Sequence, residues 1–157
     1  MEVPMRCLQL GLAALAATAT LPFFASADSL PDFTGAWQMD TAKSQVEDGR
    51  VVSLTIEHVS NKLKMVRTIR AKDGKEVVSQ FVCATMGAEC ELDDAGRKAK
   101  VSVWYNGPAL VVLKTEGPKE DASDEWTFKL SDPKTLTVAL EHIDPTSKDE
   151  TLVFSKK

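Results

Sequence analysis

The sequence predicts an all-β protein, an antiparallel up-and-down meander that closes into a barrel of about 8–10 strands. Three observations lead to this fold class. Apolar and polar residues alternate in short runs from Val51 onward, turn-forming residues interrupt these runs at short intervals, and no segment keeps a helical period. An open meander of this length would leave two unpaired edges. Closure removes both edges and creates an interior that is either filled or hollow.

The alternating runs define the expected strands one after another. A first strand opens at Gly35, and the segment from Asp40 to Gly49, which lacks strand character, is expected to be a loop or one short helix over an open end. Later strands are expected at residues 51–59, 63–70, 77–83, 89–92, 99–105, 109–115, 125–130, 135–143 and 150–155. Because short turns join them, consecutive strands are expected to pair.

The turn residues set the expected registers. Asp73-Gly74 favours the positive φ angles of a tight hairpin. At Asn106-Gly107-Pro108 we expect a slightly longer loop, because Pro108 lacks the N–H that a two-residue turn would require. That loop pairs Tyr105 with Ala109. One face of the two strands then carries Val101, Val103, Val111 and Leu113, and we expect this face to be interior.

The first 27 residues have the pattern of a secretion signal. Arg6 supplies a positive start, Leu8 to Leu21 is an uncharged apolar run, and Ala25-Ser26-Ala27 offers the small residues of a cleavage site. The run is shorter than the roughly 20 residues that span a bilayer, so we expect cleavage rather than a retained anchor and no stable membrane insertion. Cys7 precedes the apolar run, which argues against a lipoprotein signal. We expect a periplasmic or secreted protein whose single domain is residues 28–157.

Composition and charge narrow the classes of partner and chemistry. The formal net charge is −4, and no basic block is present that would follow a nucleic-acid backbone, so we expect neither nucleic acid nor an anionic lipid surface as partner. No catalytic or metal motif stands out. His58 and His142 each follow a strand pattern, without a partner at ligand or triad spacing, and are expected to be solvated. We therefore expect no catalytic residues, no metal and no cofactor.

Cleavage of the leader leaves two cysteines, Cys83 and Cys90, in a compartment that permits disulfides. Thr85-Met86-Gly87 between them is a plausible chain reversal, so the sulfurs can meet across a hairpin. We expect a structural disulfide. A thiol redox centre would prefer a Cys-x-x-Cys spacing, and a zinc site would need more ligands than these.

The residues Gly35-Ala36-Trp37 resemble the Gly-x-Trp signature of lipocalins, and the stretch from Phe33 to Ser44 is similar to the opening of small secreted bacterial lipocalin-like (calycin-like) proteins. The aromatic-turn-Gly pattern from Tyr105 to Val111 and the late hairpin around Trp126 and Leu136 agree with it. The resemblance covers the chain from Asp32 to its end. It implies an up-and-down barrel in which Trp37 packs at the closed end, commonly beneath an Arg from a late strand. This sequence departs from that pattern, since its last Arg is Arg97 and only Lys156 and Lys157 stand near its end.

Arg67 is the one charged residue that interrupts an apolar alternation, which also contains Leu63, Met65 and Ile69. If this face points inward, Arg67 would bind a ligand carboxylate, since a buried guanidinium needs an anion. If the register is shifted by one residue, Arg67 is surface charge.

The leading functional hypothesis is an exported, non-enzymatic binding protein for a small apolar or amphipathic molecule. Its expected ligand-binding residues are Met65, Arg67, Phe81, Val101, Val103 and Leu113. A structural or interaction module, such as an inhibitor or envelope accessory with a filled barrel core, is the alternative. An enzyme ranks third, because no acid–base pair is visible. The interior volume separates the first two hypotheses, and the sequence does not identify a protein partner.

Overall fold

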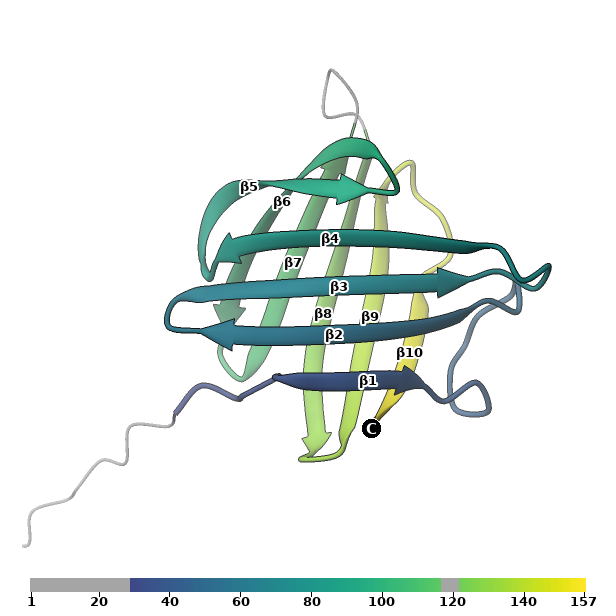
Figure 1. Ribbon diagram of the computed structural model, residues 1–157, viewed down its shortest axis with the longest axis horizontal. Helices are drawn as coiled ribbons and strands as arrows, with labels where there is room; N and C mark the ends of the chain where they lie inside the picture. The colour runs from purple at the N-terminus through teal and green to yellow at the C-terminus, as the bar shows by residue number, and fades with distance from the viewer. Residues whose placement is uncertain (1–28, 117–121) are drawn as a thin grey trace, which may run out of the picture.

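The computed structural model describes residues 29–116 and 122–157, and the expected leader at residues 1–27 lies outside them. The described residues form ten strands that close into an antiparallel barrel, with each strand paired to the next and β1 paired to β10 (Figure 1). The strands are β1 (Gly35–Met39), β2 (Val51–Val59), β3 (Lys62–Arg70), β4 (Glu76–Ala84), β5 (Met86–Asp94), β6 (Arg97–Asn106), β7 (Ala109–Glu116), β8 (Ala122–Asp132), β9 (Thr135–Asp144) and β10 (Glu150–Lys156). The predicted all-β meander and its closure are confirmed.

Two layers of strands face each other across the core of the barrel (Figure 1). In Figure 1, β1 to β4 cross the front of the molecule while β6 to β9 pass behind them at a steep angle. Alternate residues of both layers point inward, and side chains such as Ile56, Leu63, Val103 and Leu136 are fully buried between them. The interior is therefore largely filled by the strands' own apolar side chains.

The antiparallel order gives the barrel two distinct ends. Residues 29–34 and the β2–β3, β4–β5, β6–β7 and β8–β9 turns gather at one end, which we call the amino-terminal end. The connections after β1, β3, β5, β7 and β9 gather at the other, which we call the distal end. Phe33, only 1% exposed, lies in the core just before β1.

Trp37 is the anchor of the first strand. Its ring is 1% exposed, and its Nε1 donates a hydrogen bond of 2.9 Å to the carbonyl oxygen of Phe33. Lys156 of β10 pairs with Trp37 and places its Nζ 5.3 Å from the ring centroid. The late-strand cation over this tryptophan is thus a lysine. A side chain on Gly35, whose φ is +148°, would place its Cβ 2.5 Å from Cε of this lysine. The glycine of the motif therefore leaves room for the lysine that lies beside the tryptophan ring.

The segment between β1 and β2 is a loop and not a helix. Asp40 N–H donates to the carbonyl oxygen of Val153, and Gln45 forms an isolated bridge with Thr151. Ser44 Oγ accepts a hydrogen bond of 2.9 Å from the N–H of Val153. The first part of this loop therefore runs along β10 at the distal end.

The β6–β7 hairpin differs from the sequence expectation by one residue. Asn106 pairs with Ala109, so the loop has only two residues, Gly107 and Pro108, with Gly107 at a φ of +58°. Pro108 is tolerated because the N–H groups that close a two-residue hairpin belong to the flanking residues. Val112 now lies opposite Val103, and Leu113 opposite Ser102, which puts Leu113 on the outer face. The expected interior position of Leu113 was wrong.

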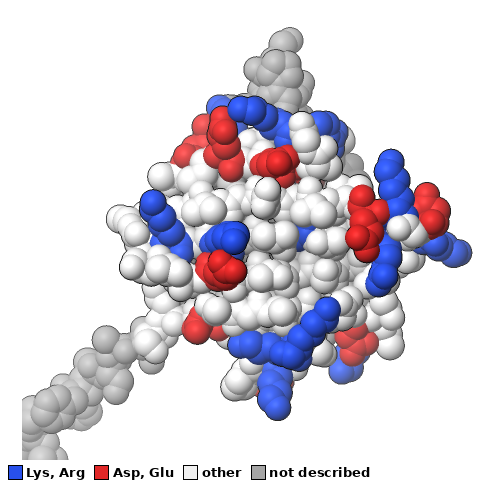
Figure 2. Space-filling model, viewed as in Figure 1, with Lys and Arg blue, Asp and Glu red and all other residues white. Residues whose placement is uncertain are grey.

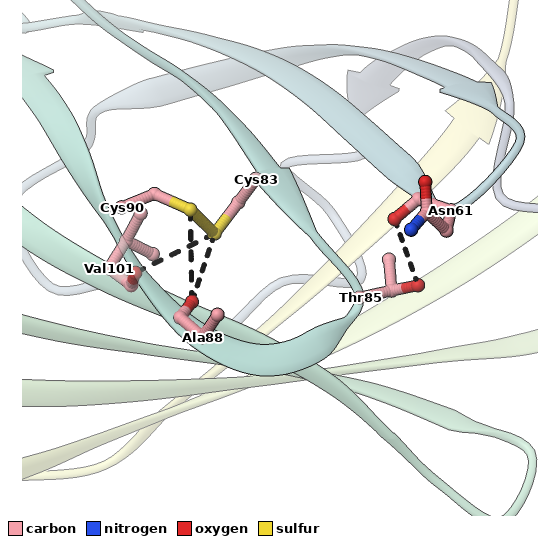
Figure 3. Close-up of a disulfide and its surroundings, with 6 residues drawn as sticks. All are labelled: Asn61, Cys83, Thr85, Ala88, Cys90 and Val101. Carbon is pink, nitrogen blue, oxygen red and sulfur yellow. Dashed lines mark hydrogen bonds between the residues drawn. A yellow bond between two sulfur atoms is a disulfide. The ribbon is translucent and has the colours of Figure 1, made fainter.

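The expected disulfide is present between Cys83 and Cys90, whose Cα atoms are 5.7 Å apart (Figure 3). The ladder between β4 and β5 pairs Ser79 through Phe81, and the disulfide joins the strands two residues beyond its last pair. The following turn is tied to its neighbour, because the N–H of Thr85 donates to the carbonyl oxygen of Asn61 at 2.9 Å. The bridge therefore holds β4 to β5 where the backbone ladder has ended.

The outer surface seen in Figure 2 carries Lys and Arg interspersed with Asp and Glu among uncharged residues. Val78 and Val82 of β4 are exposed. Within the described residues, no helix is long and apolar enough to cross a lipid bilayer.

Candidate functional site

A small cavity lies inside the barrel, between β2 and β3 on one side and β8, β9 and β10 on the other. Its volume is about 40 Å³, room for only a few water molecules. The lining is apolar apart from two arginines and consists of Arg50, Val52, Leu54, Arg67, Ile69, Trp126, Phe128, Val138, Leu140, Leu152 and Phe154. Both arginines belong to the half of the barrel that ends in the distal loops.

Arg67 is the central polar side chain of this cavity. Its side chain is 16% exposed, and its Cζ lies 4.1 Å from the ring centroid of Trp126, a cation–π contact that covers one face of the guanidinium. Its Nη2 lies 3.3 Å from Ser79 Oγ and 3.6 Å from Asp94 Oδ1. Its Nε is buried and has no hydrogen-bond partner in the described part of the chain. Arg67, which lines the cavity, therefore keeps one buried N–H donor without an acceptor.

Asp94 connects Arg67 to an interior ion cluster, by which we mean Arg67, Ser79, Asp94, Lys114 and Glu116. Ser79 donates to Asp94 Oδ1 at 2.5 Å, and Lys114 Nζ donates to Asp94 Oδ2 at 2.8 Å. Lys114 also lies 2.9 Å from Glu116 Oε1. Lys114 comes from β7 and reaches Asp94 of β5 across the inner face of β6. Four strands thus contribute to a cluster with two cations and two carboxylates.

Electrostatics fixes the charge states within this cluster. Burial would raise the pKa of the Asp94 carboxyl, but the hydrogen bonds from Lys114 and Ser79 outweigh burial and hold that pKa well below its usual range. Burial lowers the pKa of the Arg67 guanidinium, and the Asp94 carboxylate opposes this change. Arginine does not deprotonate in proteins, so Arg67 and Asp94 face each other as a cation and an anion.

Arg50, the other arginine in the lining, also has carboxylate partners. It makes a bidentate pair with Glu150, in which Nη1 lies 3.1 Å from Oε1, and its Nη1 lies 2.9 Å from Asp48 Oδ2. Arg50 and Glu150 are the residues that flank β2 and begin β10 at the distal end. This pair ties the two strands together beside the cavity.

The expected ligand-binding residues are only partly brought together. Arg67 points inward and lines the cavity, so the interior alternative for this residue is the one observed. Met65, Phe81, Val101 and Val103 are also interior and at most 5% exposed, but they pack in the core outside the cavity lining. Leu113 faces outward, for the reason given above. The anion that Arg67 was expected to need is supplied by the chain itself, through Asp94.

Sequence reasoning missed several residues of the site. Asp94 lies beyond the strand expected at residues 89–92, although it alternates with the buried Leu92 along β5. Lys114 was hidden by the register error, because it alternates with Leu110 and Val112 only when the hairpin loop has two residues. Arg50 alternates with Val52 and Leu54 and was detectable by that pattern.

The two histidines are less solvated than expected. His142 Nδ1 lies 2.6 Å from Asp124 Oδ1 on the neighbouring strand. His58 Nε2 is buried and lacks a hydrogen-bond partner among the described residues, with its ring 6.3 Å from that of Tyr105. Across residues 29–116 and 122–157, no group of three or more His, Cys, Asp or Glu side chains is arranged to hold a metal ion.

The fold is a closed ten-stranded antiparallel barrel, the architecture expected of a lipocalin-like barrel. The sequence matches no protein-family model and no curated protein. The solved structures do show similar folds.

Apo lipid binding protein 8 of Caenorhabditis elegans has a TM-score of 0.58 at 13% identity, covering 80% of this chain and 95% of its own. Fatty-acid-binding protein 1 of Echinococcus granulosus has a TM-score of 0.57 at 12% identity, covering 79% and 96%. A mutant of the fluorescent protein UnaG has a TM-score of 0.57 at 17% identity, covering 80% and 96%. At these identities the likeness establishes the fold alone.

Proposed function

We propose that this chain is a non-enzymatic binding protein that takes a small apolar or amphipathic molecule into the cavity beside Arg67. The observation that carries the proposal is the combination of an apolar lining with one buried N–H donor, Arg67 Nε, that has no acceptor among the described residues. Apolar walls with a few placed polar groups are the usual composition of a small-molecule site. Removal of the ligand's apolar surface from water would provide most of the affinity.

The cavity volume limits how such a ligand binds. At about 40 Å³ the cavity is well below the ~300 Å³ or more of typical ligand pockets, so a ligand of more than a few heavy atoms displaces side chains. Ile69, Leu140 and Leu152 are the apolar lining residues with most exposure, and they lie on strands β3, β9 and β10. We expect the pocket to enlarge by movement of these side chains.

Two of the similar structures are named for lipid binding and fatty-acid binding, which supports a binding role for a barrel of this shape. The same fold hosts many functions, so the site's own residues carry the argument. The small cavity favours a second candidate, an interaction module with a filled core whose function lies in its loops.

We further propose that the chain is exported and that residues 28–157 are the mature protein. The leader pattern supports this, and so does the disulfide, since disulfides persist in oxidising compartments.

Titration of the isotopically labelled mature protein, residues 28–157, with 2-hexanone distinguishes the binding protein from the interaction module. Saturable NMR shifts at Trp126 and at the methyl groups of Ile69 and Leu140 are expected for the binding protein. Phe128→Ala, which enlarges the cavity, should bind more tightly, whereas Val78→Ala on the outer face should bind like the parent. No saturable shift in either the parent or Phe128→Ala would reject the binding function in favour of the interaction module.

A further inference from the structure

We propose that the polar group of the ligand is an uncharged hydrogen-bond acceptor, such as a ketone, ester or amide carbonyl, and not a carboxylate. This inference rests on the proposed binding function and names the ligand chemistry that the cavity accepts. It follows from how the charges around Arg67 are already satisfied.

The charged side chains inside the barrel are already paired with one another. The positive charge of Arg67 faces Asp94 Oδ1 at 3.6 Å, and that of Lys114 lies 2.8 Å from Asp94 Oδ2 and 2.9 Å from Glu116 Oε1. Arg97 Nη2 also lies 3.7 Å from Asp94 Oδ2 and 3.9 Å from Glu116 Oε1, but the Arg97 side chain is 75% exposed and water screens its charge. Apart from Arg97, the interior ion cluster holds two cations and two anions. A carboxylate brought beside Arg67 would add an uncompensated negative charge in a region from which most water is excluded.

The N–H donors that Arg67 would need for a carboxylate are partly in use. A bidentate carboxylate uses two parallel N–H donors, and the partner of Nε in such a fork is Nη2. Arg67 Nη2 already lies 3.3 Å from Ser79 Oγ and close to Asp94. Nε is the buried donor of Arg67 that lacks an acceptor among the described residues, and one donor matches one carbonyl oxygen.

Arg50, the other arginine of the cavity lining, is already paired with carboxylates. Arg50 holds Glu150 through both terminal nitrogens and also contacts Asp48. The carboxylates of Asp94, Asp124 and Glu116 all act on Arg67, and the Arg50 cation acts against them, so three anions and one cation contribute to the field at Arg67. The charged groups around the cavity therefore disfavour a further anion.

The test uses three six-carbon probes, 2-hexanone, hexanoate and hexane, at neutral pH. The readout is the Arg67 Nε–H signal in the NMR spectrum of the labelled protein, together with the dissociation constant of each probe. We expect 2-hexanone to shift this signal and to bind at least tenfold more tightly than hexanoate, with hexane weaker than the ketone and without effect on Nε–H.

Two variants probe the chemistry. Arg67→Met should raise the dissociation constant of 2-hexanone about tenfold or more, because it removes the N–H donor. The dissociation constant of hexane should stay unchanged, because methionine keeps the apolar volume. Asp94 keeps Lys114 as a partner in this variant, so we expect it to fold. Asp94→Asn should make hexanoate bind more tightly, because it removes the carboxylate that faces the charge of Arg67. Arg70→Met, on the same strand but exposed, is the matched control and should bind all probes like the parent.

Hexanoate binding more tightly than 2-hexanone in the parent protein would overturn the inference while leaving the binding function standing. An equal loss of affinity for 2-hexanone and hexane in Arg67→Met would also overturn the inference, because such a loss would indicate a collapsed pocket and not a lost hydrogen bond. Absence of binding by all three probes would reject the proposed function and this inference with it.

Discussion

Replacing Asp94 by Asn should destabilise the protein by about 3 kcal/mol, because it removes the charge that holds the interior ion cluster together. Asp94 is 5% exposed and accepts hydrogen bonds of 2.5 Å from Ser79 and 2.8 Å from Lys114. Breaking a buried ion pair by removing one partner typically costs about 3 to 5 kcal/mol. Glu116, 2.9 Å from Lys114, still offsets part of that lysine's charge, so we expect the lower end of the range.

The free energy of unfolding, measured by urea titration at pH 7, tests this value. Asp93→Asn is the matched control, because Asp93 is exposed on the same strand. Among the described residues its side chain accepts a hydrogen bond only from the N–H of Gly96 in the turn. This variant should change the free energy of unfolding by less than about 0.5 kcal/mol. The double variant Asp94→Asn, Lys114→Met removes one charge of each sign. It should cost at least about 1.5 kcal/mol less than the sum of the single variants.

The pH dependence gives an independent readout of the same cluster. The pKa of Asp94 is lower in the folded protein than in the unfolded chain, so its contribution is present above the unfolded value of about 3.9 and is lost as the pH falls through the folded value. The stability gap between parent and Asp94→Asn should therefore narrow below about pH 4. A gap under about 1 kcal/mol at pH 7, or one that stays constant from neutral to strongly acidic pH, would refute the reasoning.

Three further predictions concern the anchor, the disulfide and the leader. Trp37→Ala should lower the free energy of unfolding by about 3 to 5 kcal/mol, because the ring is fully buried. Lys156→Met, which loses the cation beside the ring and a positive charge that acts on Asp32, should cost about 0.5 to 1 kcal/mol. A change below about 0.5 kcal/mol for Trp37→Ala in urea titrations would contradict the packing described. The Cys83→Ser, Cys90→Ser double variant should lose about 2 to 3 kcal/mol of the free energy of unfolding, the value of the chain-entropy model for so short a loop. Thiol alkylation of the exported parent should label these two cysteines only after reduction. Labelling before reduction would argue against the bridge. The intact mass of the exported protein should correspond to residues 28–157, and recovery of a membrane-bound product that retains Met1 would contradict cleavage after Ala27.

The sequence by itself determined the features that depend on local pattern. Alternation with period two located the strands, because successive side chains of a strand point to opposite faces whatever the surroundings. The turn residues separated the strands, and the short spacing of Cys83 and Cys90 placed two sulfurs across one reversal. Gly35 and Trp37 marked the first strand, although the cation over the ring, Lys156, comes from β10 at the other end of the chain.

The tertiary structure decided everything that depends on which groups meet through space. Alternation divides a strand into two faces without saying which is interior, so one residue of register at the β6–β7 turn exchanged Leu113 for Lys114 inside the barrel. The partner of Arg67 could not be read from the chain, because Ser79 and Asp94 join it through the successive pairing of β3, β4 and β5. The volume of the cavity depends on how side chains from five strands fill the space between two layers, and only packing in three dimensions sets that volume.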